Sequence, residues 1–301
     1  MNTINTQPTY NHSFELSKEL IKVKLSIGQY SGRVKSKRLS QETAVQHEAD
    51  EASIDSILKL LKDDDSKPIK KIGNKARTLF YDMTLPFEDD KWYIIPNAMF
   101  GKLQTELTQH EVEFKDAVND LVARYDKLLE DYKQRMGKLV DYAHFPSAVE
   151  LKSKFYFKLE TDVIADPSTV SLKNISAQLD HKIRSEVEAR LKHQVSEAQA
   201  DVAKRIVTMM TRIVDTLSDT TKDQGTFRDS LIGNVRDAVD ILPSLNVLND
   251  SRITAAIKKI QDEITPVHPQ VLRDDNQVKA KVKQSAKSVL DDLKDFKPIT
   301  I

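Results

Sequence analysis

The apolar positions along this chain repeat with two different periods, which predicts a mixture of strands and helices. Over 20–30, apolar residues alternate with polar ones, a pattern typical of a half-buried strand. Residues 154–164 alternate in the same way, and 77–87 and 91–96 are aromatic and β-branched segments that flank an acidic turn. These segments predict a small, mostly antiparallel sheet.

Two longer segments have helical periodicity. The first covers about 103–142, and its apolar residues recur at alternating steps of 4 and 3 from Phe114 to Tyr132, which is a heptad pattern. The second covers about 176–221 and repeats every eleven residues. Because these periods differ, the two seams cannot pair along their whole length, and we expect apolar surface that pairs with another copy or another protein. The residues expected at this oligomer or partner interface are Phe114, Leu121, Tyr125, Leu128, Val202, Ile206, Met209 and Ile213.

Shorter helices are predicted at 41–62, 226–242, 251–264 and 276–296, and Ser147 with Glu150 has the spacing of a capping box. The predicted fold class is α+β, a small mostly antiparallel sheet with a long helical, coiled-coil-like arm and C-terminal helices. The expected domains are a discontinuous α/β base at 18–100 plus 143–172, the arm at 101–142 plus 174–222, and a C-terminal helical region at 223–301.

Composition narrows the classes of partner. Lys and Arg number 46 and Asp and Glu number 46, so no global charge attracts nucleic acid or an anionic membrane, and such a partner needs a local patch. Absence of Cys excludes disulfides and thiolate chemistry and fits a reducing cytoplasm. The N-terminal stretch lacks the basic and apolar parts of a signal peptide, and no apolar run is long enough to span a bilayer. We therefore expect a cytoplasmic protein with no membrane partner.

The one basic stretch singled out by the sequence is 31–38, which follows the first predicted strand. Cations separated by Ser and Gly suit contacts to nucleic-acid phosphates. The alternative is a solvated loop of a neutral protein, because short basic runs are common. The candidate nucleic-acid-binding residues are Arg33, Lys35, Lys37 and Arg38.

Catalytic chemistry has weak support. Asp82, Asp89 and Lys91 follow the outline of a metal nuclease, but Asp89 and Lys91 fall in a predicted turn, and an acidic turn between strands explains them more simply. The seven His are scattered, and the seven Gly form no phosphate-cradling loop. We expect no enzymatic activity, no cofactor and no metal.

Three stretches together resemble a known family: LSIGQYSGRVKSK (25–37), WYIIPNAMFGKLQTEL (92–107) and YAHFPSAVELKSKFYFKLE (142–160). Their order is similar to that of uncharacterised proteins from tailed phages, plasmids and integrative elements, which often have Trp where this chain has Tyr30. Genes of that family often lie near one for a MoxR-like AAA+ ATPase. The resemblance implies an accessory role in a mobile-element programme in a bacterial cytoplasm, with such an ATPase as a partner, and supplies no catalytic residues.

Two functions remain open at this point. The first is a non-enzymatic bacteriophage or mobile-element scaffold or adaptor that forms a homo-oligomer and binds a protein partner. The alternative is a nucleic-acid-binding accessory protein that uses 31–38. Phosphate contacts make binding fall steeply with salt, which distinguishes the second function from the first.

Overall fold

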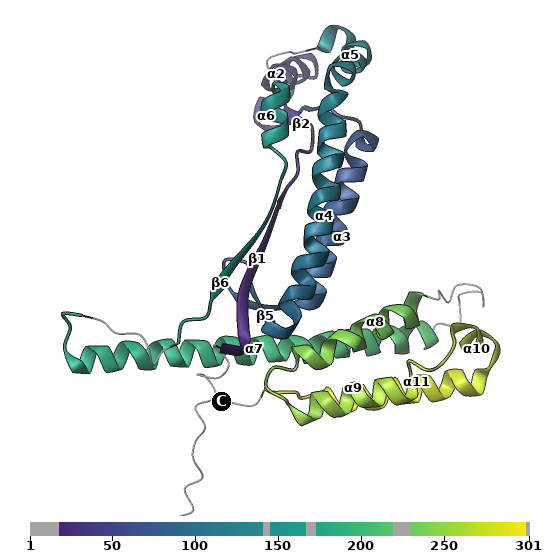
Figure 1. Cartoon of the computed structure of the whole chain (residues 1–301). Helices are drawn as coiled ribbons and strands as arrows, with labels where there is room; N and C mark the ends of the chain where they lie inside the picture. Colours follow the sequence, from purple (N-terminus) through teal and green to yellow (C-terminus); the bar gives the residue numbers. More distant parts are fainter. Residues whose placement is uncertain (1–17, 141–144, 167–172, 219–229, 299–301) are drawn as a thin grey trace, which may run out of the picture. The chain divides into compact units, whose positions relative to one another are not determined.

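The structure, a computed structural model, describes residues 18–140, 145–166, 173–218 and 230–298. These residues form an α+β protein with a small four-stranded antiparallel sheet and long helices (Figure 1), which confirms the predicted fold class. The chain divides into two compact units. The first unit is Met1–Lys24, Tyr81–Leu103 and Thr161–Ile301, and the second unit is Leu25–Phe80 and Gln104–Glu160.

The four-stranded sheet has the order β4-β5-β1-β6. Its strands are β1 (Leu20–Gly28), β4 (Leu85–Glu88), β5 (Trp92–Pro96) and β6 (Tyr156–Val163). In the antiparallel pair of β1 and β5, Val23 lies opposite Tyr93. The sequence therefore placed three strands correctly: β1 and β6 by their alternating pattern, and β5 by its aromatic and β-branched residues.

The prediction of a strand over 77–87 is wrong for most of that segment. Residues up to Met83 belong to helix α3 (Asp63–Met83), and only β4 is extended. A helix begins where the predicted helix 41–62 was expected to end: Asp63, Asp64 and Asp65 occupy the first turn of α3, where free backbone N–H groups favour negative charge. Pro68 lies inside the helix without ending it.

The predicted helix over 41–62 is shorter and lies earlier in the chain. Residues 33–59 form four elements: β2 (Arg33–Lys35), α2 (Lys37–Gln46), the 3₁₀ turn η1 (Glu51–Ser53) and β3 (Ile57–Lys59). β2 and β3 pair antiparallel as a separate two-stranded sheet. The side chain of Ser36 caps α2, and that of Ser40 accepts a hydrogen bond from the backbone N–H of Ser56, which folds the segment back on itself.

The remaining helices largely follow the predicted pattern. They are α4 (Asn97–Ala123), α5 (Tyr125–Met136), the 3₁₀ turn η2 (Gly137–Leu139), α6 (Ala148–Ser153), α7 (Ala177–Ser218), α8 (Ser230–Leu245), α9 (Ser251–Glu263), α10 (Pro269–Asp274) and α11 (Asn276–Leu293). The first long predicted helix is thus α4 and α5, interrupted at Arg124. The capping box of Ser147 and Glu150 is present, whereas α10 was not predicted.

Each unit has its own apolar core. In the second unit, the heptad seam of α4 and α5 packs with Ile69 of α3 and with Leu151 of α6. Tyr125 lies in this core and donates a hydrogen bond from its hydroxyl to the backbone oxygen of Pro146 at 2.7 Å. Burial raises the pKa of Tyr125 to about 12.

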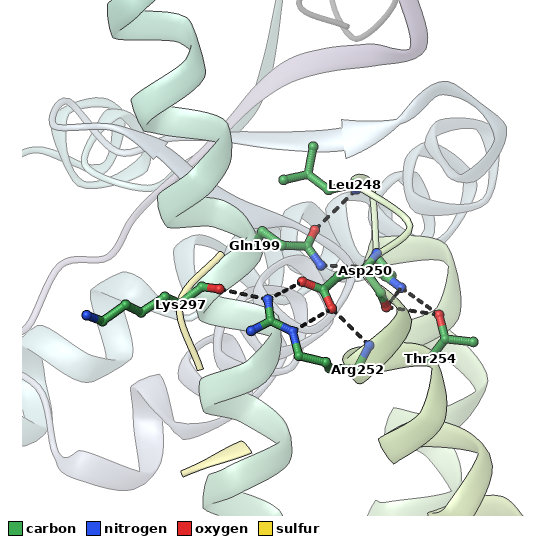
Figure 2. Close-up of polar contacts among 7 residues, drawn as sticks. Gln199, Leu248, Asp250, Arg252, Thr254 and Lys297 are labelled. Atoms are coloured by element: carbon green, nitrogen blue, oxygen red, sulfur yellow. Dashed lines mark hydrogen bonds and ion pairs between the residues drawn. The ribbon is translucent and has the colours of Figure 1, made fainter. Parts of the chain in front are cut away.

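In the first unit, α7 packs against the sheet and against α8, α9 and α11 (Figure 1). Its buried side chains recur along one side from Leu191 to Leu217, as the eleven-residue pattern predicts. The corner between α8 and α9 is tied to α7 by polar contacts (Figure 2). Gln199 donates from Nε2 to Asn246 Oδ1 at 2.5 Å, Asn246 donates from Nδ2 to Thr254 Oγ1 at 3.0 Å, and Asp250 caps α9 while its carboxylate binds Arg252.

This division differs from the expected one, which joined 101–142 and 174–222 into one arm. Helix α7 belongs to the first unit, and α4 from Gln104 onward belongs to the second. The residues expected at an interface are therefore covered within the chain. Phe114, Leu121, Tyr125 and Leu128 are buried in the second unit, Val202, Ile206 and Ile213 are buried in the first, and Met209 is partly buried. The reason is that each seam is covered by other elements of its own unit.

Candidate interaction surfaces

The basic stretch 31–38 is folded rather than a free loop. Arg33 and Lys35 lie on β2, and Lys37 and Arg38 begin α2, with all four side chains exposed. Lys35 Nζ lies 2.5 Å from Asp55 Oδ2, and Arg38 Nη1 lies 2.9 Å from Glu42 Oε1. Two of the four cations thus have carboxylate partners, so the stretch carries less unbalanced charge than its sequence indicates.

The residues of the nuclease-like outline lie in two different elements: Asp89 and Lys91 fall in the turn between β4 and β5, as expected, and Asp82 is helical. Asp82 is in the last turn of α3, where its backbone oxygen accepts a hydrogen bond from Arg205 Nη1 at 3.1 Å, and Thr84 O accepts one from Arg205 Nη2 at 2.6 Å. Burial raises the pKa of the Asp82 carboxyl, and the charge of Arg205 partly offsets this effect. Among the described residues, no group of three or more His, Asp or Glu is placed to hold a metal ion.

An apolar line leaves the core at the N-terminal end of α7. Leu179, Ile183 and Val187 are spaced by four and continue the line of Leu191 and Val195, which are buried. None of the side chains from 177 to 190 is buried, and Leu179 is 46% exposed. Figure 1 shows this part of α7 extending beyond α8, α9 and α11. We call the three residues 179, 183 and 187 the α7 apolar line.

Charges border the α7 apolar line on both sides. Asp180 and Arg184 lie on one side, with Arg184 Nε 2.8 Å from Asp180 Oδ2. Lys182 and Glu186 lie on the other, with Nζ 3.8 Å from Oε1. Each border therefore carries one acid and one base, separated by a turn of helix.

A basic face runs along α3 in the second unit. Residues 66–81 include no Asp or Glu. Six polar side chains between 67 and 78 recur at the spacing of one helix face, and all six are exposed or partly exposed. The α3 basic face consists of Lys67, Lys70, Lys71, Asn74, Lys75 and Thr78.

The opposite side of α3 is held by specific contacts. Gln29 Nε2 donates to the backbone oxygen of Ile69 at 3.4 Å, and Gly73 allows this approach, since a Cβ there would lie 2.1 Å from that Nε2. Arg77 donates from Nη2 to Ile27 O at 2.9 Å and from Nη1 to Asn74 Oδ1 at 3.2 Å. These contacts fix the helix about its axis, so the α3 basic face is kept on the outside.

The sequence analysis did not indicate this face, because it predicted no helix between 62 and 77 and predicted a strand at 77–87. The signal that could have found it is the acid-free stretch combined with helical spacing of cations. By contrast, the α7 apolar line was part of the predicted seam, but its exposure depends on where the covering helices end.

The fold and these surfaces define a helix-rich α+β protein with two units, each with its own core. Residues 17–271 match the family described as "Protein of unknown function (DUF3150)", and the chain belongs to that family. No curated protein and no solved structure matches the chain. None of the helices in the described ranges is long and apolar enough to cross a membrane.

Proposed function

We propose that this protein is a non-enzymatic scaffold or adaptor that assembles with a second copy of itself through the α7 apolar line. The observation that carries the proposal is that the α7 core stripe continues beyond its buried part, to Leu179, which is exposed, and to Ile183 and Val187, which are partly exposed. Apolar side chains aligned on one helix face gain free energy when another helix covers them.

Charge complementarity fits a second copy of the chain, and we place that copy in antiparallel orientation. With a two-fold axis at Ile183, that residue faces Ile183 of the second copy, and Leu179 faces Val187 of the second copy. On one border Asp180 then meets Arg184, and on the other Lys182 meets Glu186. Exposed ion pairs contribute at most about 1 kcal/mol each, so the apolar contacts supply most of the affinity.

The wider role is that of a mobile-element accessory protein in the bacterial cytoplasm, with a MoxR-like AAA+ ATPase as its protein partner. This part of the proposal rests on the resemblance of three sequence segments, 25–37, 92–107 and 142–160. A paired helix would give such a partner a two-fold repeated surface to bind.

Sedimentation equilibrium of the full chain tests self-association. The wild type is expected at twice its 34.3 kDa mass, and a Leu179→Asp, Ile183→Asp variant at the single mass. Val271→Asp is the matched control, because Val271 is a helical apolar residue of the same unit with a similar exposure of 42%. Lys182→Glu should weaken the pair, and adding Glu186→Lys should restore it. A wild-type monomer at all concentrations would contradict the proposal.

The second candidate function is nucleic-acid binding by 31–38. It is favoured by Arg33 and Lys37, which have no carboxylate within ion-pair distance among the described residues. The test is retention on a DNA duplex after all four cations of the stretch are changed to Ala, with thermal stability as the folding control. Equal binding by variant and wild type would exclude this stretch as the contact.

A further inference from the structure

We propose that the α3 basic face is a binding site for the phosphate backbone of a nucleic-acid duplex. This site is separate from the α7 apolar line and from the stretch 31–38. It is formed by one rigid element, a helix whose inner side is fixed by Gln29 and Arg77. A fixed row of cations loses less freedom on binding than cations on a mobile loop.

The middle of the face has unbalanced positive charge. Lys70 and Lys71 have no carboxylate within ion-pair distance among the described residues, whereas Lys67 Nζ lies 3.6 Å from the exposed Asp64 Oδ1. The pKa of Glu113 is lowered mainly by hydrogen bonds from Gln109 and His110, and in smaller part by the nearby charge of Lys75. Asp64 and Glu113 therefore offset positive charge at Lys67 and Lys75, whereas Lys70 and Lys71 between them remain available to an anionic partner.

Spacing fits a duplex. Lys67, Lys71 and Lys75 are one helical turn apart, which places about 12 Å between the first and the last at ~1.5 Å per residue. A duplex carries one phosphate charge per ~1.7 Å of axis, so about seven phosphates lie within that length. Four lysines can therefore all find phosphate partners at once.

Two further side chains on the face are donors of the kind that bind phosphate oxygens. Asn74 accepts a hydrogen bond from Arg77 at its Oδ1, which leaves its Nδ2 donors for a ligand. Thr78 adds a hydroxyl. Residues 67–78 contain no Phe, Tyr or Trp, and the exposed Tyr81 one turn further on already packs its ring on Tyr93, with ring centroids 5.3 Å apart. The face therefore lacks the row of free aromatic rings that single-strand binders combine with their cations. Backbone contact to a duplex, without reading of sequence, is the mode that these residues fit.

The same helix is poorly suited to a membrane surface. Binding in the interfacial plane requires an apolar side that enters the lipid, and the apolar side of α3 is occupied. Ile69, Ala76 and Phe80 are buried, at 1%, 0% and 1% exposure. Binding to an anionic vesicle could then rest only on electrostatic attraction. The experiment below tests vesicles and duplex separately.

The test is fluorescence anisotropy of a labelled 30-base-pair DNA duplex with the full chain at several salt concentrations. Four contacts predict a slope of about −3.6 for log K against log salt, which is about 100-fold weaker binding at 200 mM than at 50 mM. Changing the face's four lysines, Lys67, Lys70, Lys71 and Lys75, to Gln should flatten this dependence and abolish binding at 50 mM. The matched control changes Lys279, Lys281, Lys283 and Lys287 of α11 to Gln, which removes the same charge from the first unit.

Several results would overturn the proposal. They are absence of duplex binding by the wild type at 50 mM salt, equal loss in the α11 control, loss only in the variant of 31–38, and binding to phosphatidylserine vesicles without binding to the duplex. If the quadruple variant melts at a lower temperature, the single exposed change Lys71→Glu replaces it, and the same loss of duplex binding is expected. Unchanged affinity in that correctly folded variant would also count against the site. None of these outcomes depends on the mass of the oligomer. Duplex binding by α3 can therefore be disproved without disproving self-association through α7, and the reverse also holds.

Discussion

Gln199 of α7 donates a hydrogen bond to Asn246, 47 residues further along the chain, and both side chains are buried. Asn246 also binds the backbone of Asp250 and the hydroxyl of Thr254, so one amide holds the α8–α9 corner together and against α7 (Figure 2). Buried polar groups that lose their partner cost about 1–3 kcal/mol. We expect Asn246→Ala to lower the free energy of unfolding of the first unit by about that amount in urea denaturation.

A matched control is Asn234→Ala, on the exposed side of α8. Ala has the higher helix propensity, so this change should leave stability equal or slightly raised. If both variants unfolded at the same urea concentration, the amide of Asn246 would not hold the corner.

The carboxylate of Asp250 makes stability depend on pH. The hydrogen bond from Arg252 is the main reason that the pKa of Asp250 is lowered in the folded state. A lowered pKa means that the charged carboxylate stabilises the fold above its unfolded pKa of about 3.9, and that this contribution is lost as the pH falls through the folded pKa. Asn can still cap α9 but cannot titrate.

We therefore expect Asp250→Asn to lower the melting temperature at pH 7, and the difference from wild type to shrink at pH 3. Calorimetry at both pH values measures this. A difference of the same size at both values would show that Asp250 acts through its shape alone.

Gly28 of β1 lies under the ring of Tyr156 of β6. A Cβ at Gly28 would be 2.1 Å from Tyr156 Cε1, so Gly28→Ala forces the ring to move. Overpacking of this kind costs about 1–3 kcal/mol. The penalty should largely vanish when Tyr156 is also changed to Ala, and a double-mutant cycle measures this coupling.

The control for this cycle is Gly101→Ala in α4, where no heavy atom lies within 4 Å of the added Cβ. There Ala should stabilise the helix by up to about 1 kcal/mol. Additive effects of the changes at Gly28 and Tyr156 would mean that the ring does not restrict position 28.

The local sequence pattern was sufficient to predict an element where the repeat of its apolar residues matches the element that forms. β1 and β6 alternate strictly, α7 repeats its apolar side over ten turns, and the cap at Ser147 requires only Glu150 three residues later. In each case one stretch of sequence contains the whole signal.

Elements that depend on distant partners were not predicted. The strand-like residues Leu79 and Phe80 are helical: they continue α3, whose buried side chains Ile69, Ala76 and Phe80 recur at helical spacing. The repeat lengths of the two apolar seams also did not show that each long helix is packed against other elements of its own unit. The α3 basic face was missed for the first of these reasons, because its cations share one side only if 67–78 is helical.

The chain has no Cys, so a single introduced Cys reports directly on the α7 pair. A disulfide requires Cβ atoms about 3.5–4.5 Å apart, which in the antiparallel pair is satisfied at the two-fold axis and not one turn away. We expect Ile183→Cys to form a covalent dimer under mild oxidation, Leu179→Cys alone to stay monomeric, and a mixture of Leu179→Cys with Val187→Cys to form the mixed dimer. Monomeric Ile183→Cys, or dimers of Leu179→Cys as efficient as those of Ile183→Cys, would contradict antiparallel self-association through α7.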